Sequence, residues 1–208
     1  MENQINIYTN EIMDKLVSES EFALNSLCLM FPISYAMNLV ELNWNDIYFA
    51  YINGYINNSD VIYFAIDEKE KGCSNETIID LAYLNANSIT KDELIYDYFF
   101  KLIKPKEDVA TKDKLLYILL HFLYDKRKWF EDPFQAIEVI YADFSYPSNI
   151  QSLVRFMPIA EGNNTYSSET DRLNKNWEIY LQNQARFYRD ETREQSGDQS
   201  GDGSMIES

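Results

Sequence analysis

Apolar residues recur at the spacing of α-helices along most of this chain, and short polar stretches separate one segment from the next. The pattern predicts helices within residues 10–30, 33–42, 46–54, 60–71, 75–86, 94–103, 112–130, 134–144 and 168–191, with a further short helix from Ser148 to Phe156. The last long segment is mostly polar, so we expect it to dock on the rest of the fold by its apolar stripe alone: Leu173, Trp177, Tyr180, Leu181 and Phe187.

Capping residues indicate where these helices begin and end. Side chains of Ser, Thr, Asn and Asp accept hydrogen bonds from the first turn of a helix, whereas glycine favours the left-handed conformation that ends one. The predicted N-caps are Asn43 or Asn45, Ser59, Ser74, Thr90 in a capping box with Glu93, Thr111, and Asp132 before Pro133. Gly54 and Gly72 should each end a helix.

Glycine is scarce in the body of the chain, which leaves few of the turns that short-stranded β-folds need. There are six glycines, and three of them lie in the last twelve residues. We therefore predict an all-α fold of about eight or nine helices, which form a single helical domain over residues 1–192. The remaining residues, 193–208, are rich in Gly, Ser and Asp and are predicted to form a disordered tail.

A short internal similarity indicates how the helices pack. Residues 50–53 (Ala-Tyr-Ile-Asn) match residues 82–85 (Ala-Tyr-Leu-Asn), and residues 61–63 match residues 94–96, at an offset of 32 to 33 residues. That offset is the length of a helical-hairpin repeat. The fold should therefore consist of stacked antiparallel helical hairpins with a repeat-like character.

Trp44, Tyr48, Tyr51 and Tyr55 form an aromatic stripe along one face of a helix, because they follow one another at intervals of four, three and four residues. In stacked hairpins, such a stripe fills the core or the contact between hairpins, and this is the interpretation we favour. Two alternatives remain open. The rings could form a platform on which a ligand stacks, or part of a protein interface, since tyrosine combines an apolar ring with a polar hydroxyl.

The chain is strongly acidic, with a formal net charge of −16, and most of that charge lies in the first half. Residues 1–104 hold 16 acidic and 6 basic side chains, whereas residues 105–160 hold 8 and 7. Such a charge repels phosphate backbones, so we expect no direct binding of nucleic acid. The excess of Asp and Glu either serves solubility or presents a face complementary to a basic partner.

Targeting signals and membrane spans are not evident in the sequence. The first residues, MENQINIYTNE, lack the basic and apolar stretches of a secretory signal. The longest apolar run, residues 115–124, covers ten residues, and a bilayer needs about 20. We therefore expect no membrane association and a cytoplasmic location. Cys28 and Cys73 have no neighbours at metal-ligand spacing, so they should be buried thiols.

No set of residues in the sequence indicates a catalytic reaction. His121 is the only histidine, and its apolar surroundings (LLHFLY) predict a core or boundary residue with one hydrogen bond. The glycine-rich phosphate loops, the G-x-S-x-G elbow, and the H-E-x-x-H and C-x-x-C motifs are absent. The paired acids within residues 67–71 and 131–134 fit helix caps and solvated helix ends better than a carboxylate metal site. The sequence therefore predicts no catalytic residue, no metal site and no cofactor, and it argues against an enzyme.

Two stretches carry a resemblance to known proteins: ELNWNDIYFAYINGYI (41–56) and DLAYLNANSITKDELIYDYF (80–99). Within residues 30–160 the chain resembles a family of small acidic helical bacterial proteins, which are encoded beside polymorphic toxins and are regarded as candidate immunity proteins. The resemblance implies a helical fold and a protein partner. It implies no catalytic residues.

The acidity and the resemblance together predict an immunity-type inhibitor, which binds a cognate basic toxin domain, such as a nuclease, and blocks it without turnover. The main alternative is a helical-repeat scaffold for protein interactions with no toxin partner, and an enzyme that uses carboxylates is a third hypothesis. Asp67, Glu68 and Glu70 are the predicted partner-binding residues, because carboxylates near a helix C-terminus oppose the helix dipole and so indicate a purpose beyond stability. A solvated helix face, interleaved with Lys69 and Lys71, is the alternative interpretation.

Overall fold

Helices make up almost all of the regular structure of the protein. The computed structural model describes residues 7–84, 92–104, 108–157 and 167–197, apart from the side chains of residues 92–93 and 191–197. In chain order the elements are α1 (Asn10–Glu19), α2 (Ile33–Met37), α3 (Trp44–Ile52), α4 (Asn58–Glu70), α5 (Glu76–Ala82), α6 (Asp92–Leu102), α7 (Val109–Asp125), the 3-10 helix η2 (Arg127–Trp129), α8 (Pro133–Asp143), the 3-10 helix η3 (Ser148–Leu153) and α9 (Glu169–Gly197). Within those ranges there is no strand, only an isolated bridge between Tyr8 and Phe130, so the all-α prediction is confirmed.

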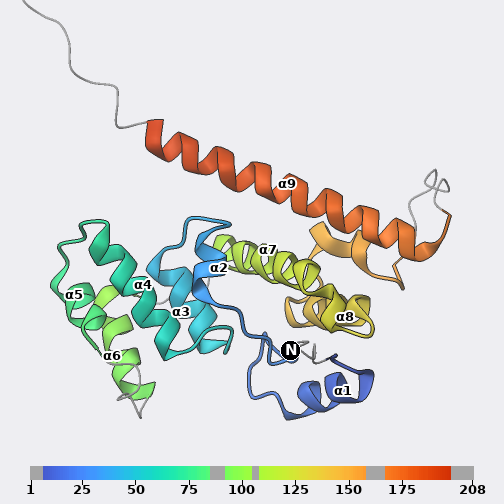
Figure 1. The fold of residues 1–208 in the computed structure, drawn as a ribbon, viewed down its shortest axis with the longest axis horizontal. Helices are drawn as coiled ribbons and strands as arrows, with labels where there is room; N and C mark the ends of the chain where they lie inside the picture. Colours follow the sequence, from blue (N-terminus) through green and yellow to red (C-terminus); the bar gives the residue numbers. More distant parts are fainter. Residues whose placement is uncertain (1–6, 85–91, 105–107, 158–166, 198–208) are drawn as a thin grey trace, which may run out of the picture.

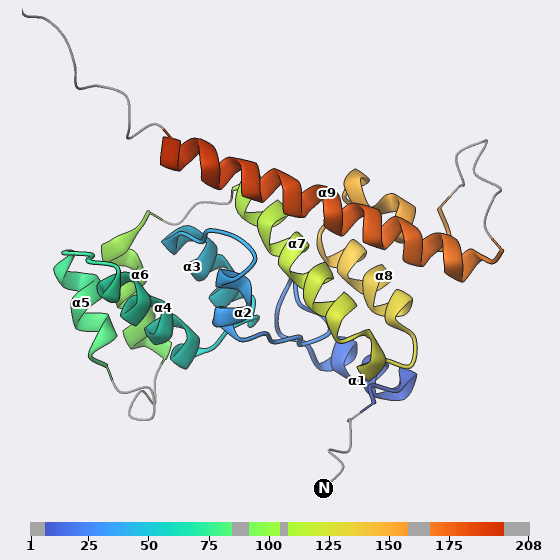
Figure 2. The same ribbon diagram turned by 45° about the horizontal axis from the view of Figure 1, so that its top comes forward.

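The helices form two groups that meet where α3 packs against α7 (Figures 1 and 2). In the first group, α4 packs against α2, α3 and α5, and α6 packs against α3 and α5. In the second group, α8 and α9 each contact both α7 and η3. Figure 1 shows α9 running along the outside of the molecule over α7. α7 therefore lies between the two groups and packs against helices of both.

Asparagine, rather than serine, caps three helices of the first group: α3, α4 and α5. Asn43 caps α3, as predicted, and Asn57 caps α4, each in a capping box that the aspartate three residues later completes. The predicted cap Ser59 is therefore wrong, since it lies inside the first turn of α4. The predicted cap Ser74 is also wrong, because the side chain of Asn75 accepts the hydrogen bond at the start of α5.

α7 begins earlier than the sequence predicts. Asp108 is its N-cap, with a side chain that accepts a hydrogen bond from the Ala110 N–H at 3.1 Å. Thr111, the predicted cap, is buried in the first turn, where its hydroxyl has a different partner on α3. The α8 start at Asp132 and Pro133 is confirmed. The predicted pair Thr90 and Glu93 falls outside the residues whose side chains are described.

Side-chain hydrogen bonds end α1 at Glu19, well before residue 30. The Asn25 side chain accepts from the Leu29 N–H at 2.8 Å and donates to the Leu29 carbonyl at 2.9 Å. Ser26 donates from its backbone N–H and from its hydroxyl to Asp143 of α8, at 2.9 and 2.6 Å. These bonds offer the backbone an alternative to the helix, so the segment that precedes α2 folds as a turn pinned to α8.

The aromatic stripe belongs to the core, as predicted. Tyr51 and Tyr55 are buried, while Trp44 and Tyr48 are partly buried against the same core. Phe99 of α6 is the common neighbour of three of these rings, with its centroid 6.3 Å from Trp44, 5.2 Å from Tyr48 and 5.5 Å from Tyr51. The rings therefore hold α3 against α6.

The two halves of the internal similarity occupy different environments, so a repeat is not confirmed. Tyr51 is 9% exposed, whereas its counterpart Tyr83 is 73% exposed. The Lys69 ammonium lies over the Tyr83 ring, 3.8 Å from its centroid, which is a surface contact. Val61 is buried, while its counterpart Leu94 is exposed. Similar sequence here produces helices that pack in different ways.

The apolar stripe of α9 docks the helix almost as predicted. Leu173, Trp177, Tyr180 and Leu181 are buried, but Phe187 is exposed and Tyr188 is buried instead. Residue 188 follows residue 181 by two helical turns, so it lies on the same face. The helix continues to Gly197 and thus includes the first residues of the predicted tail, while residues 198–208 lie outside the described part of the chain.

Candidate functional site

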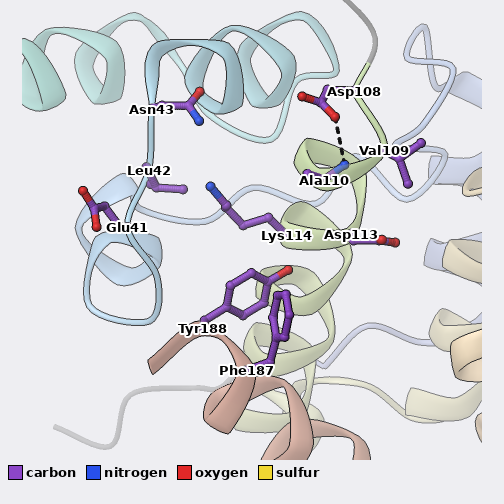
Figure 3. Close-up of a pocket in the computed structure, with 10 residues that line it drawn as sticks. All are labelled: Glu41, Leu42, Asn43, Asp108, Val109, Ala110, Asp113, Lys114, Phe187 and Tyr188. Atoms are coloured by element: carbon purple, nitrogen blue, oxygen red, sulfur yellow. Dashed lines mark hydrogen bonds between the residues drawn. The ribbon is translucent and has the colours of Figure 1, made fainter. Parts of the chain in front are cut away.

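A groove runs between α7, the part of α9 around Tyr188, and the segment 37–43 that links α2 to α3. We call it the α9 groove. It consists of two adjoining hollows of about 660 Å³ and about 710 Å³, both lined by Glu41 and Tyr188. Figure 3 shows the first hollow, with Glu41 on the α2–α3 link at the left, Lys114 reaching from α7 toward it, and the Tyr188 and Phe187 rings below.

A buried ion pair fixes the floor of the first hollow. Asp46 of α3 accepts from the Lys114 ammonium at 2.7 Å, from the Thr111 hydroxyl at 2.7 Å and from the Asn43 N–H at 3.0 Å. The side chains of Asp46 and Lys114 are 6% and 15% exposed. Asp46 therefore completes the capping box of α3 and also offsets the charge of Lys114, which lines the hollow.

Stacked aromatic rings join the wall on α9 to the floor on α7. The rings of Tyr117 and Tyr188 lie 5.3 Å apart between centroids and are nearly parallel, and Phe187 meets Tyr188 edge-on at 5.0 Å. Burial raises the pKa of Tyr117, and the nearby charge of Arg189 opposes this effect. Tyr117 therefore stays a neutral phenol at physiological pH, so the stack adds no charge to the groove.

His121 lines the second hollow, where Tyr35 of α2 holds its ring. The Tyr35 oxygen lies 2.7 Å from His121 Nδ1 and donates to Asp125 Oδ2 at 2.9 Å. Burial lowers the pKa of His121, while the charge of Asp125 raises it. Burial and the hydrogen bond to Asp125 raise the pKa of Tyr35. His121 is half-buried with a hydrogen-bond partner, as the sequence predicts for a boundary histidine.

The predicted partner-binding residues lie at the C-terminal end of α4, next to the second hollow. Asp67 pairs with Lys71 at 2.6 Å, Glu68 is half-buried, and Glu70 is exposed. Lys71 itself lines the hollow. Its hydrogen bond to Asp67 raises the pKa of Lys71, burial lowers it, and the charges of Glu68 and Glu41 raise it further. The structure thus joins the acidic end of α4 to the groove, and the role of these carboxylates stays a prediction.

The groove residues themselves were not found from the sequence. Glu41, Tyr117 and Tyr188 lie on the α2–α3 link, α7 and α9, and each has an ordinary local pattern. Only the packing of α9 across α7 brings them together. No local spacing could have indicated the site.

The described residues contain no group of three or more His, Cys, Asp and Glu side chains that could hold a metal ion. Among the helices of the described ranges, none combines the length and the apolar character that crossing a bilayer requires. The groove and the acidic end of α4 beside it are the features from which we argue a function.

A bacterial family includes most of this chain. The family described as "Uncharacterized protein conserved in bacteria (DUF2247)" matches residues 33–185. The chain belongs to the DUF2247 family. The DUF2247 match includes the α2–α3 link and all of α7, and it ends two residues before Phe187, so the α9 wall of the groove lies mostly beyond it. No curated protein and no solved structure matches the chain.

Proposed function

We propose that this DUF2247 protein is an immunity-type inhibitor. It binds a cognate toxin domain of basic charge through an acidic surface and blocks the active site or the substrate path of that domain without turnover. The proposal is supported by the resemblance described above and by one structural observation, the charge on the surface of the α4–α5 hairpin.

Exposed carboxylates dominate this hairpin, whose two helices pack side by side (Figure 2). Glu70, Glu76 and Asp80 are exposed. The two lysines of the hairpin are engaged locally, because Lys69 lies over a tyrosine ring at 3.8 Å and Lys71 pairs with an aspartate at 2.6 Å. The surface therefore presents negative charge to an approaching partner.

A surface of this kind acts mainly on the rate of encounter. Complementary potentials steer association, and salt screens the effect over about 10 Å at 0.1 M ionic strength. Rim charges contribute less to the dissociation rate than desolvated contacts do. Charge reversal should therefore slow association while the fold stays intact.

The test compares two triple variants with the same change in net charge. One carries Asp67→Lys, Glu68→Lys and Glu70→Lys on α4. The matched control reverses three exposed acids of α1, a helix that lies away from α4 and α5, below α7 in Figure 2: Glu11, Asp14 and Glu19. The gene directly upstream is identified first, and where it encodes a large secreted protein, the C-terminal domain of that protein is the partner in the binding assay.

At low ionic strength the α4 variant should associate several-fold more slowly than wild type, with a flatter salt dependence, and the α1 variant should associate at the wild-type rate. Equal association rates for both variants would mean that the α4 carboxylates are not part of the interface. No binding to the upstream product would contradict the proposed function.

One observation favours a scaffold that binds an apolar partner. A hollow of about 440 Å³ lies between the turn before α2, the start of α4, and α6, and it is lined in part by Phe22, Met30, Tyr51 and Tyr96. Phe22 and Met30 are exposed, and aromatic and Met side chains are enriched at protein interfaces. A partner at this hollow would bind with little salt dependence, and Met30→Asp would weaken it while the α4 variant would not.

A further inference from the structure

We infer that the second hollow of the α9 groove is a recognition pocket for a guanidinium group, and that His121 Nε2 and Glu41 are its acceptors. The occupant is an arginine side chain of a protein partner. The inference rests on the proposed function, since it names the chemistry by which the basic partner is recognised.

The hydrogen bonds of Tyr35 decide which nitrogen of His121 carries the proton. A phenol has one O–H to donate, and a carboxylate can only accept. The Tyr35 oxygen lies 2.9 Å from Asp125 Oδ2 and 2.7 Å from His121 Nδ1. If Tyr35 donated to His121, its oxygen and the carboxylate oxygen would face each other with no proton between them. Tyr35 therefore donates to Asp125, and His121 Nδ1–H donates to Tyr35.

This tautomer leaves Nε2 as an acceptor. The neutral imidazole has one N–H, which is engaged at Nδ1, so Nε2 carries the lone pair. Within the described residues, no hydrogen-bond partner of Nε2 is present, and His121 lines the hollow. The Tyr35–Asp125 pair thus holds an imidazole whose open nitrogen can accept from a ligand with an N–H or O–H donor.

The rest of the hollow favours a planar cationic donor. Glu41 is exposed, lines both hollows and supplies a carboxylate. Tyr117 and Tyr188 also line the hollow, where both are buried and their rings stack on each other. A guanidinium offers several N–H donors in a rigid plane, whereas an ammonium offers a point charge.

Two cations also border the hollow, and they limit which ligand can enter. Lys71 is paired with Asp67 at 2.6 Å, so its charge is offset. Arg189 is exposed on α9. If these two dominated, the hollow would select an anion, so an anionic probe is part of the test.

The single histidine makes the test direct, because the imidazole NMR signals of the full chain report this pocket alone. The probes are N-acetyl-arginine amide, its uncharged isostere N-acetyl-citrulline amide, N-acetyl-lysine amide and inorganic phosphate. We expect a saturable shift of the His121 signals with the arginine probe, a weaker response to lysine and none to citrulline. Saturable binding of phosphate, or no saturable response to arginine, would overturn the inference. So would ¹⁵N shifts that place the proton on Nε2.

Conservative variants separate recognition from folding. Glu41→Gln should weaken the arginine probe about tenfold, as expected for loss of a charge-assisted hydrogen bond. The matched control Glu70→Gln, at another exposed acid, should leave the affinity unchanged. Equal affinity for Glu41→Gln and wild type would remove Glu41 from the pocket and contradict the inference. Tyr35→Phe removes the oxygen that accepts from Nδ1, so both tautomers should appear in its spectrum.

The two proposals can fail separately, because the probes need no toxin. Binding of the arginine probe without binding of the upstream toxin domain would support the arginine pocket and reject the immunity function. The toxin domain could also bind without competition from the arginine probe and with no loss of affinity in Glu41→Gln. That result would reject the arginine pocket and support the immunity function.

Discussion

Removal of the Asp46 carboxylate should be among the most damaging changes at the surface of the groove. Asp46→Ala removes a capping-box bond, leaves the buried Thr111 hydroxyl without its partner, and strands the Lys114 charge. A buried polar group left unsatisfied costs about 1–3 kcal/mol. Breaking a fully buried ion pair costs about 3–5 kcal/mol, and a surface pair contributes about 0–1 kcal/mol. Lys114 is 15% exposed, so the ion pair should contribute less than a fully buried pair does. For the three losses together we expect a decrease of about 3–5 kcal/mol in the free energy of unfolding.

Asp60 provides a matched control. It holds the same position in the capping box of α4 and also accepts from the Ile33 N–H at 3.0 Å, but it has no lysine partner in the described structure. Asp60→Ala should therefore cost about 1–3 kcal/mol, less than Asp46→Ala. Urea unfolding followed by circular dichroism measures both, and an unchanged m-value confirms that the same transition is compared.

The double variant Asp46→Ala/Lys114→Met tests the charge term. Replacing the stranded lysine by methionine removes the uncompensated charge. The loss in the free energy of unfolding for the double variant should therefore be about 1–3 kcal/mol smaller than the sum of the losses for Asp46→Ala and Lys114→Met. A coupling energy below about 0.5 kcal/mol would refute the reasoning, because the pair would then act as an exposed one.

Three further predictions follow from burial, backbone geometry and protonation. Tyr51→Ala should lower the free energy of unfolding by about 3–5 kcal/mol and Tyr83→Ala by less than about 0.5 kcal/mol, as measured by urea unfolding. Similar losses would mean that the two tyrosines are equivalent, as in a structural repeat. Gly54→Ala should destabilise more than Gly72→Ala: both have positive φ, but a Cβ at 54 would clash with the Phe22 ring and one at 72 meets open space. The extra cost should disappear in Phe22→Ala/Gly54→Ala, and its persistence would contradict the clash. Because burial lowers the pKa of His121, the unfolded chain binds the proton more tightly, so the free energy of unfolding should fall as the pH drops below about 6.5. His121→Gln should lose this part of the pH dependence between about pH 7 and 5, and an unchanged slope would contradict the lowered pKa.

The helices could be predicted from the sequence because each carries its own signal. The apolar stripe of α9 and the caps Asn43 and Asp132 act within a few residues, and the structure confirms them. The errors occur where a side chain has a distant partner. Thr111 resembles a cap but donates to Asp46, and Ser26 lies in a predicted helix but bonds Asp143, 117 residues away. Such contacts have no local pattern.

The same reasoning explains why the groove persists in a well-packed fold. The buried stripe of α9 is directed at α7 and η3, and the first helical group is attached to α7 through α3. Three contacts then fix the walls at set distances from α7: Asp46 with Lys114, Tyr35 with His121, and Tyr117 with Tyr188. A binding surface held in this way loses little conformational entropy when a partner docks. Variants that break one of the three contacts should therefore weaken a partner bound in the groove more than their effect on stability accounts for, whereas a partner bound only at the α4 carboxylates would not sense them.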